Sequence, residues 1–348
     1  MSLDIDKLIE DVQYNCHITD ARHGAEYGLC TYLMKMREYY RWEMGFGYAQ
    51  RLDKDEVGDW LSEREGLWDE LDGEDYRSLA IGGQTYDPFD VESINRFLRE
   101  YRLIYSGGLV QSGRVQFFLA ELLDYEQGDD GFELWVGQRE LARGLHAPPA
   151  MTRGRTIYLR RESLRQFLWE KYESWLWSKP ENAMGRALAF YPFSDDVEAA
   201  LDQMTSDEMS VVRAHEIGEY RAGQQLGPEW EELLLQVLGT PAELMLRAVR
   251  DHLADCLETL PMILENEVPE AVLHTFVGNL GNMRKAIFPS LAPAYEAWLE
   301  GDKQLMVELP EKAAIHWQQV AERALLLSAE TPAGTAAQAA RLVEANHY

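Results

Sequence analysis

The residues best suited to chemistry lie in the segment TSDEMSVVRAHEIGEYRAG, residues 205–223. Thr205 and Glu208 have the spacing of a capping box, which predicts that a helix starts there. In this helix, a rotation of about 100° per residue places His215, Glu216 and Glu219 on the apolar side. Burying an unpaired carboxylate is costly, so such groups are usually paired, protonated or bound to a metal. His215 and Glu219 are one helical turn apart, so one helix can offer both to a single ion. The pattern predicts a metal site with His215 and Glu219 as ligands and Glu216 as the catalytic acid or base.

Three interpretations of this segment stay open. The first is a site for iron, manganese or zinc that supports redox chemistry or hydrolysis by an activated water, as in an oxidoreductase or a hydrolase. The second is acid–base chemistry without a metal. The third is a metal-free interaction or scaffold protein, in which the buried His and Glu side chains pair with arginines of neighbouring helices.

Known metal motifs match this segment only in part. The run HEIGE differs from the HExxH motif of zinc proteases, because Glu219 occupies the position of the second histidine. Histidine and glutamate on facing helices resemble the di-iron carboxylate bundles more closely, although the residue order differs. A second helix would have to complete such a site, which would hold one or two metal ions.

A long helix expected at about residues 20–44 offers such a partner. His23 and Glu26 are three residues apart and lie within its apolar stripe, which makes them a workable ligand pair. His17 and Asp20 add two candidates just upstream. The alternative is that His23 is a capping or core histidine and that Glu26 forms an ion pair with an arginine.

The segment PAELMLRAVRDHLADCLETLP predicts a third helix with a clear apolar stripe. Asp251 and Asp255 project opposite that stripe. On a surface helix they are solvated acids. In a central helix covered on both sides, they would line a polar cavity and join the metal ligands.

A locally basic stretch lies between Arg143 and Arg165. Arginine binds carboxylate and phosphate groups with two parallel hydrogen bonds. Arg153, Arg155 and Arg160 therefore predict a binding site for an anionic small molecule or cofactor. Alternatively, these arginines neutralise an acidic helical face against which a small sheet packs.

The elements that must position these residues are mainly helical. The runs VQFFLAELLDY and FELWV flank a turn rich in Gly and Asp, and this pattern predicts a β-hairpin. We expect a multi-helix bundle with a small inserted antiparallel β subdomain, α+β overall. The predicted regions are an N-terminal helical region at 1–102, a β-rich insertion at 103–160 and a C-terminal helical domain at 161–348 that packs with the first.

Composition excludes several classes of function. The 348 residues carry 33 Lys and Arg against 60 Asp and Glu, a net charge of -27, which repels nucleic acids and anionic membranes. No apolar run approaches the roughly 20 residues that span a bilayer, and the 3 cysteines are far apart, so a cytoplasmic protein with reduced thiols is expected. The run GNLGN lacks the spacing of a nucleotide-binding motif. The sequence leaves the oligomeric state open.

Overall fold

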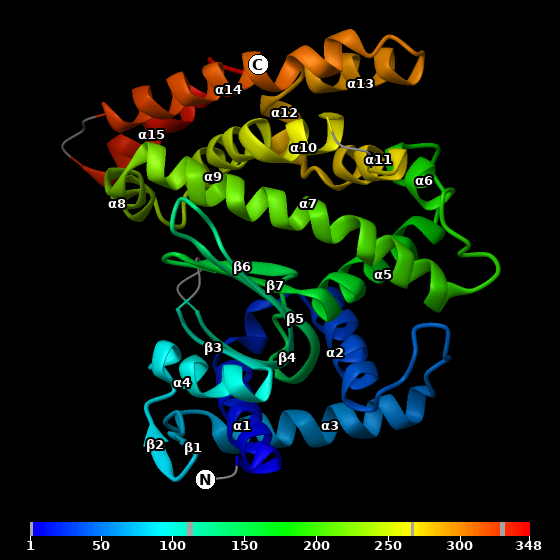
Figure 1. Ribbon diagram of the computed structural model, residues 1–348, viewed down its shortest axis with the longest axis vertical. Helices are drawn as coiled ribbons and strands as arrows, with labels where there is room; N and C mark the ends of the chain where they lie inside the picture. The colour runs from blue at the N-terminus through cyan, green and yellow to red at the C-terminus, as the bar shows by residue number, and fades with distance from the viewer. Residues whose placement is uncertain (1–2, 110–113, 266–267, 328–330) are drawn as a thin grey trace. The chain divides into compact units, whose positions relative to one another are not determined.

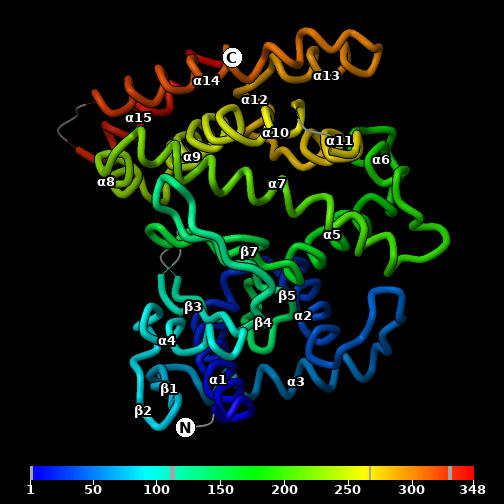
Figure 2. Tube along the Cα trace, viewed as in Figure 1, coloured from blue at the N-terminus to red at the C-terminus, as the bar shows by residue number. Residues whose placement is uncertain are grey.

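A computed structural model describes residues 3–109, 114–265, 268–327 and 331–348 of the chain. The chain forms two compact units. The first contains Met1–Trp177 and Tyr191–Thr205, and the second contains Ser178–Phe190 and Ser206–Tyr348. Figure 1 shows the elements of each unit, and Figure 2 shows the course of the chain through them.

The first unit is built on a curled, mixed five-stranded sheet (Figure 1). Its strand order is β3-β4-β5-β7-β6, and all neighbours are antiparallel except β5 and β7. Irregular register between β4 and β5 marks β-bulges, which increase twist and help to curl the sheet. The strands are β3 (Leu103–Leu109), β4 (Val115–Gln127), β5 (Glu133–Arg143), β6 (Ala150–Arg153) and β7 (Thr156–Arg160), with a separate hairpin of β1 (Leu79–Ile81) and β2 (Gln84–Tyr86).

The first unit contains the helices α1 (Ile5–His23), α2 (Leu29–Glu43), α3 (Lys54–Leu71), α4 (Val91–Leu98) and α5 (Arg161–Leu176), with short 3₁₀ turns at Gly24–Glu26 and Arg99–Tyr101. Helices α1, α4 and α5 pack on the sheet, and α3 packs on α1 and α2. Helix α1 packs against β4 and β5. Leu8, Val12 and Cys16 are four residues apart, so they form one apolar stripe, and all three are buried in the core against the sheet.

The N-terminal helices differ from the prediction in one boundary. The expected helix at 20–44 does not begin after Thr19; α1 continues to His23, and α2 begins at Leu29 after a 3₁₀ turn. Gly28 precedes α2 in an extended conformation, with a ψ of 147°. His23 and Glu26 consequently do not share one helical stripe.

The second unit is helical throughout its described residues. Its elements are α6 (Ala183–Leu188), α7 (Val197–Leu226, from Ser206 onward), α8 (Pro228–Gln236), α9 (Pro241–Ala254), a π-helical turn (Asp255–Thr259), α10 (Leu260–Glu265), α11 (Glu270–Asn279), α12 (Asn282–Ile287), α13 (Leu291–Leu299), α14 (Gln304–Leu325) and α15 (Pro332–Glu344). Helix α9 contacts α8, α12, α14 and α15. Trp230 and Trp317 are almost fully buried in this core.

The start of α7 corrects a second sequence inference. The pair Thr205 and Glu208 resembles a capping box, yet the helix begins at Val197 and Thr205 is inside it, fully buried. The side chain of Asp196 accepts a hydrogen bond from the backbone N–H of Ala199 at 3.0 Å, so Asp196 caps the helix instead.

The predicted fold class is confirmed. Helices dominate, and the β-hairpin is present as β4 and β5 within an α+β architecture. One pair of strands in the predicted antiparallel subdomain is parallel. None of the helices in the described ranges combines the length and the hydropathy that a membrane crossing needs.

Candidate functional site

His215 lies between two carboxylates in the second unit. Its Nδ1 is 2.8 Å from Oδ1 of Asp255, and its Nε2 is 3.5 Å from Oε1 of Glu219. Each carboxylate also contacts an arginine: Glu219 accepts from Arg250 at 3.2 Å, and Asp255 accepts from Arg284. The groups therefore alternate in charge along one chain of contacts that joins α7, α9, the π-helical turn and α12. We call these five residues the ionic chain.

Electrostatics inside the ionic chain favour the charged forms. Burial alone would lower the pKa of His215, but Asp255 and Glu219 together raise it well above its ordinary value. Burial opposes ionisation of Asp255 too, yet Arg284 and His215 lower the pKa of that carboxyl. The pKa of Glu219 is likewise lowered, because Arg250 and His215 outweigh burial. His215 is thus an imidazolium ion paired with two carboxylates.

Close packing of α7 on α9 brings the residues of the ionic chain together. A Cβ atom built on Gly218 would lie 2.5 Å from the carbonyl oxygen of Ala254, so only glycine permits this approach. The adjacent π-helical turn begins at Asp255. Such turns are frequent at functional sites. The structure accordingly brings His215, Glu219 and Asp255 into contact.

Asp251 and Glu216 lie beside the ionic chain. Burial and the neighbouring Glu219 raise the pKa of Asp251 to about 6, and its side chain hydrogen-bonds to Glu219. Asp251 and Asp255 therefore face α7 and are not solvated acids. Glu216 is buried and helps to raise the pKa of Arg250.

This geometry matches the arginine-paired interpretation of the sequence more closely than the metal interpretation. Among the described residues, no group of three or more His, Cys, Asp or Glu side chains is arranged to hold a metal ion. Both nitrogens of His215 face carboxylates, and those carboxylates are neutralised by arginine. Metal ligation by His215 and Glu219 stays a prediction.

The predicted partners from the N-terminal region belong to the first unit. Nδ1 of His23 is 2.7 Å from Oε1 of Glu26, and Glu26 also pairs with Arg114. The alternative interpretation expected an ion pair between Glu26 and an arginine, and Arg114 is that arginine. A shared site of these residues with His215 also stays a prediction.

The three predicted anion-binding arginines separate into two environments. Arg160 is 2% exposed and donates from Nε to Glu140 at 2.8 Å, in a buried cluster that also includes Arg143 and Ser163. Arg160 is therefore paired with the buried carboxylate of Glu140. Arg153 and Arg155 instead line a pocket of about 710 Å³ in the first unit.

This pocket, which we call the α4 pocket, lies where α4 meets one end of the sheet. Its lining combines arginines with aromatic rings. The residues are Phe89, Asp90, Val91, Glu92, Asn95, Arg96, Arg99, Tyr125, Glu133, Trp135, Arg153, Arg155, Thr156 and Tyr158. Four are basic and three acidic, so the pocket is slightly cationic in a chain whose net charge is -27.

Several polar groups of the α4 pocket are held in place. Asn95 donates to the carbonyl of Tyr105 at 2.7 Å and accepts from its N–H at 2.8 Å, which fixes α4 against β3. The guanidinium of Arg99 lies 4.3 Å from the ring centroid of Tyr125, and that ring packs against Trp135 with centroids 4.5 Å apart. One wall of the pocket is therefore a rigid aromatic surface beside a cation.

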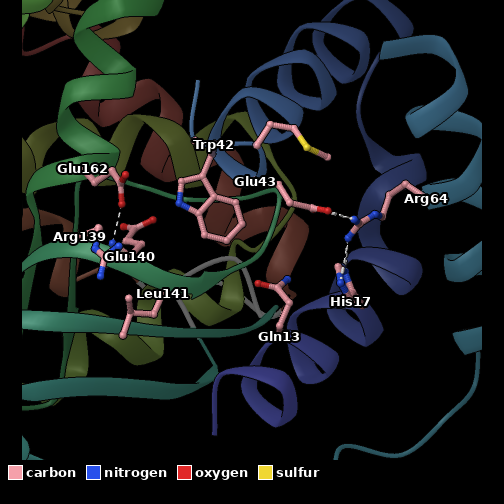
Figure 3. A pocket seen from close by; sticks show the side chains of 11 residues that line it. Gln13, His17, Trp42, Glu43, Arg64, Arg139, Glu140, Leu141 and Glu162 are labelled. Atoms are coloured by element: carbon pink, nitrogen blue, oxygen red, sulfur yellow. Dashed lines mark hydrogen bonds and ion pairs between the residues drawn. The ribbon is translucent and has the colours of Figure 1, made fainter. Parts of the chain in front are cut away.

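Figure 3 shows a second pocket of the first unit, with a volume of about 590 Å³. Trp42 stands between Glu162, Glu140 and Arg139 on one side and Glu43, Arg64 and His17 on the other. Arg64 donates to both oxygens of Glu43 at 2.6 Å, and its other terminal nitrogen is 2.9 Å from Nε2 of His17.

The polar groups of this second pocket are mostly bonded to one another. Burial, together with the charge of Arg64, lowers the pKa of His17 to about 3, so its imidazole is neutral. Glu162 accepts from the backbone N–H of Glu140 at 2.5 Å. Sequence reasoning named His17 but missed Glu43 and Arg64, which are 21 residues apart and carry no local signal of their pairing.

Comparison with known proteins identifies the family but no activity. No curated protein and no solved structure matches the sequence. Residues 7–160 match the N-terminal domain of a family of unknown function, DUF6866, and residues 165–346 match the C-terminal domain of the same family. The boundary between the two matches follows the end of β7 at Arg160. Because these matches cover most of the sequence in the order of the family's two domains, the chain belongs to the DUF6866 family.

Proposed function

We propose that the first unit binds an anionic small molecule with a planar group, and that the α4 pocket is the binding site. The volume of about 710 Å³ lies within the range of roughly 300–1,000 Å³ that is typical of small-molecule sites. The lining offers both of the features that such a ligand needs: guanidinium groups for the anion and aromatic rings for the planar part.

The observation that carries the proposal is that the guanidinium of Arg155, in the lining of the α4 pocket, has no partner among the described residues. It is exposed at the tip between β6 and β7, and its side chain makes no hydrogen bond or ion pair with the described part of the chain. Its backbone is fixed, since the carbonyl of Arg155 accepts from the N–H of Glu133 at 2.8 Å. An unpaired guanidinium on a fixed backbone in so acidic a protein favours an anion as its partner.

Arg153 adds a second, anchored guanidinium. It donates to the carbonyl of Gly107 and lies beside Gly108, where an added Cβ would be 2.6 Å from the guanidinium carbon. Gly108 has a φ of +151°, a conformation that favours glycine. The Gly107–Gly108 pair in β3 therefore makes room for Arg153, and this fixed position lowers the entropic cost of binding.

Calorimetric titration with phenyl phosphate tests the proposal, because this probe carries one phosphate and one ring. We expect Arg155→Gln to weaken binding about tenfold or more, the effect of losing one charge-assisted hydrogen bond. Inorganic phosphate should bind more weakly than phenyl phosphate, and phenol more weakly still, because each lacks one of the two features.

Arg139→Gln is the matched control. Arg139 is 64% exposed on β5, pairs with Glu121 and is outside the α4 pocket, so this variant changes the net charge equally. We expect it to bind the probe like the natural chain. Equal losses in both variants would mean that only overall charge matters, and absence of binding to the natural chain would refute the proposal for this ligand class.

A further inference from the structure

Gln116, near the start of β4, has a buried side chain without a partner. The residue is 6% exposed, and neither Nε2 nor Oε1 makes a hydrogen bond with any described residue. A buried amide that lacks both a donor and an acceptor partner costs free energy. Such a group in a folded protein calls for a partner that fits beside it.

A small cavity adjoins this amide. Besides Gln116, its lining includes Asp20, Tyr27, Arg114 and His146, and it leaves about 10 Å³ for an occupant. That is about the room that one water molecule needs. Gln116 and Asp20 both line this space.

Asp20 supplies the second half of the site. It is 5% exposed, and its two oxygens lie 3.0 and 2.9 Å from the N–H of Leu145. Burial raises the pKa of Asp20 to about 8, against the lowering effects of this hydrogen bond and of Arg64 and Arg143. Asp20 is therefore protonated at neutral pH and can donate an O–H as well as accept.

We infer that this cavity is a binding site for a single water molecule, which bridges the carboxyl of Asp20 and the amide of Gln116. Water fits because it is donor and acceptor at once, so it satisfies Oε1 and Nε2 together. The site is separate from the α4 pocket and independent of the function proposed for it.

The bound water would lie beside a neutral imidazole as well. Burial lowers the pKa of His146 to about 4, and its Nδ1 is 3.2 Å from the hydroxyl of Tyr27. A protonated carboxyl, one water and a neutral imidazole around one small cavity are the components of an acid–base site.

Two variants of the full chain test this inference by hydrogen exchange of peptides from β4, which report the unfolding of the first unit, near pH 6.5. If the water is bound, Gln116→Met removes its hydrogen bonds, and the unfolding equilibrium constant should rise about tenfold relative to the exposed control Gln138→Met. If no water is bound, the same change removes two unpaired groups, and exchange in β4 should be slower than in the control. That outcome would overturn the inference.

Asp20→Asn keeps one acceptor and one donor at the same place, so we expect it to retain the stability of the natural chain near pH 6.5. A large loss would show that Asp20 is ionised and would contradict the site as described. A high-resolution crystal structure supplies the direct readout. Density for one water within hydrogen-bond distance of Asp20 and Gln116 supports the inference, and an empty or differently filled cavity refutes it.

Discussion

Replacing Asp255 by Asn is the sharpest test of the ionic chain. Asp255 has 2% of its side chain exposed and contacts two cations, His215 and Arg284. The substitution keeps the shape but removes the central negative charge. Arg284 cannot release its proton to compensate, so a cation is left without its main partner.

The expected loss of stability follows from the burial of the partners. Removing one member of a buried ion pair costs about 3–5 kcal/mol. His215 and Arg284 retain side-chain exposures of 26% and 21%, so water screens part of the remaining charge and we expect a value near the lower limit, about 3 kcal/mol. Against a typical unfolding free energy of about 5–15 kcal/mol, that is a large fraction.

Hydrogen exchange resolved by peptide is the suitable assay, because the chain has two compact units and a single melting curve mixes them. Peptides from α9 report the unfolding free energy of the second unit directly. The matched control is Glu258→Gln, three residues away in the same π-helical turn. Glu258 pairs with Arg221, whose side chain is 42% exposed, so its loss should cost less than about 1 kcal/mol.

The pH dependence has a definite sign. The pKa of Asp255 is lowered by folding, so its contribution is present above about pH 3.9 and is lost as the pH falls toward the folded value. The pKa of His215 is raised, so its contribution is full below about pH 6.5 and is lost as the pH rises through the folded value. The difference between the natural chain and Asp255→Asn should be largest at about pH 5–6.5. Equal losses for Asp255→Asn and Glu258→Gln at that pH would refute the ionic chain as a stabilising element.

Two further predictions concern the same unit. Gly218→Ala should destabilise it by about 1–3 kcal/mol, because the added methyl group meets the carbonyl of Ala254. Gly223→Ala in the same helix meets nothing within 4 Å and should stabilise it by about 0.5–1 kcal/mol. Denaturant titration followed by the same exchange assay measures both, and a gain in stability for Gly218→Ala would refute the close contact. Elemental analysis of protein purified without an affinity tag tests the metal hypothesis: a stoichiometric metal that is lost in Glu219→Ala would support it, and iron, manganese and zinc well below one ion per chain would favour the arginine-paired interpretation.

Local patterns were sufficient to predict much of the fold. Two apolar runs around a Gly- and Asp-rich turn predicted the hairpin of β4 and β5, and the segment PAELMLRAVRDHLADCLETLP predicted the helix that begins at Pro241 as α9. The start of α7 was wrong because Thr205 and Glu208 fit a capping box by spacing alone. Its true cap, Asp196, lies nine residues earlier, and the buried environment of Thr205 depends on tertiary contacts that spacing does not encode.

The candidate site shows the same limit more clearly. Spacing correctly placed His215 and Glu219 together on α7, because both lie on one helix. It did not identify Arg250 and Arg284 as the partners of Glu219 and Asp255, which are 31 and 29 residues away along the chain. The sequence left Asp255 as either a solvated acid or part of a cavity, and the choice depended on whether a second helix covers that side of α9.

Gly218 allows α7 to cover the polar side of α9. Because it lacks a Cβ, the backbone of α7 approaches the carbonyl of Ala254 closely enough to cover the polar side of α9. The covered acids then require positive partners, which His215, Arg250 and Arg284 supply. A glycine one turn from a histidine on a helix is weak evidence for a metal, but it does indicate where two helices cross. For acidic residues on the facing helix at such a crossing, arginine partners are a better first prediction than a metal ion. A buried carboxylate needs a positive partner whether or not an ion is bound.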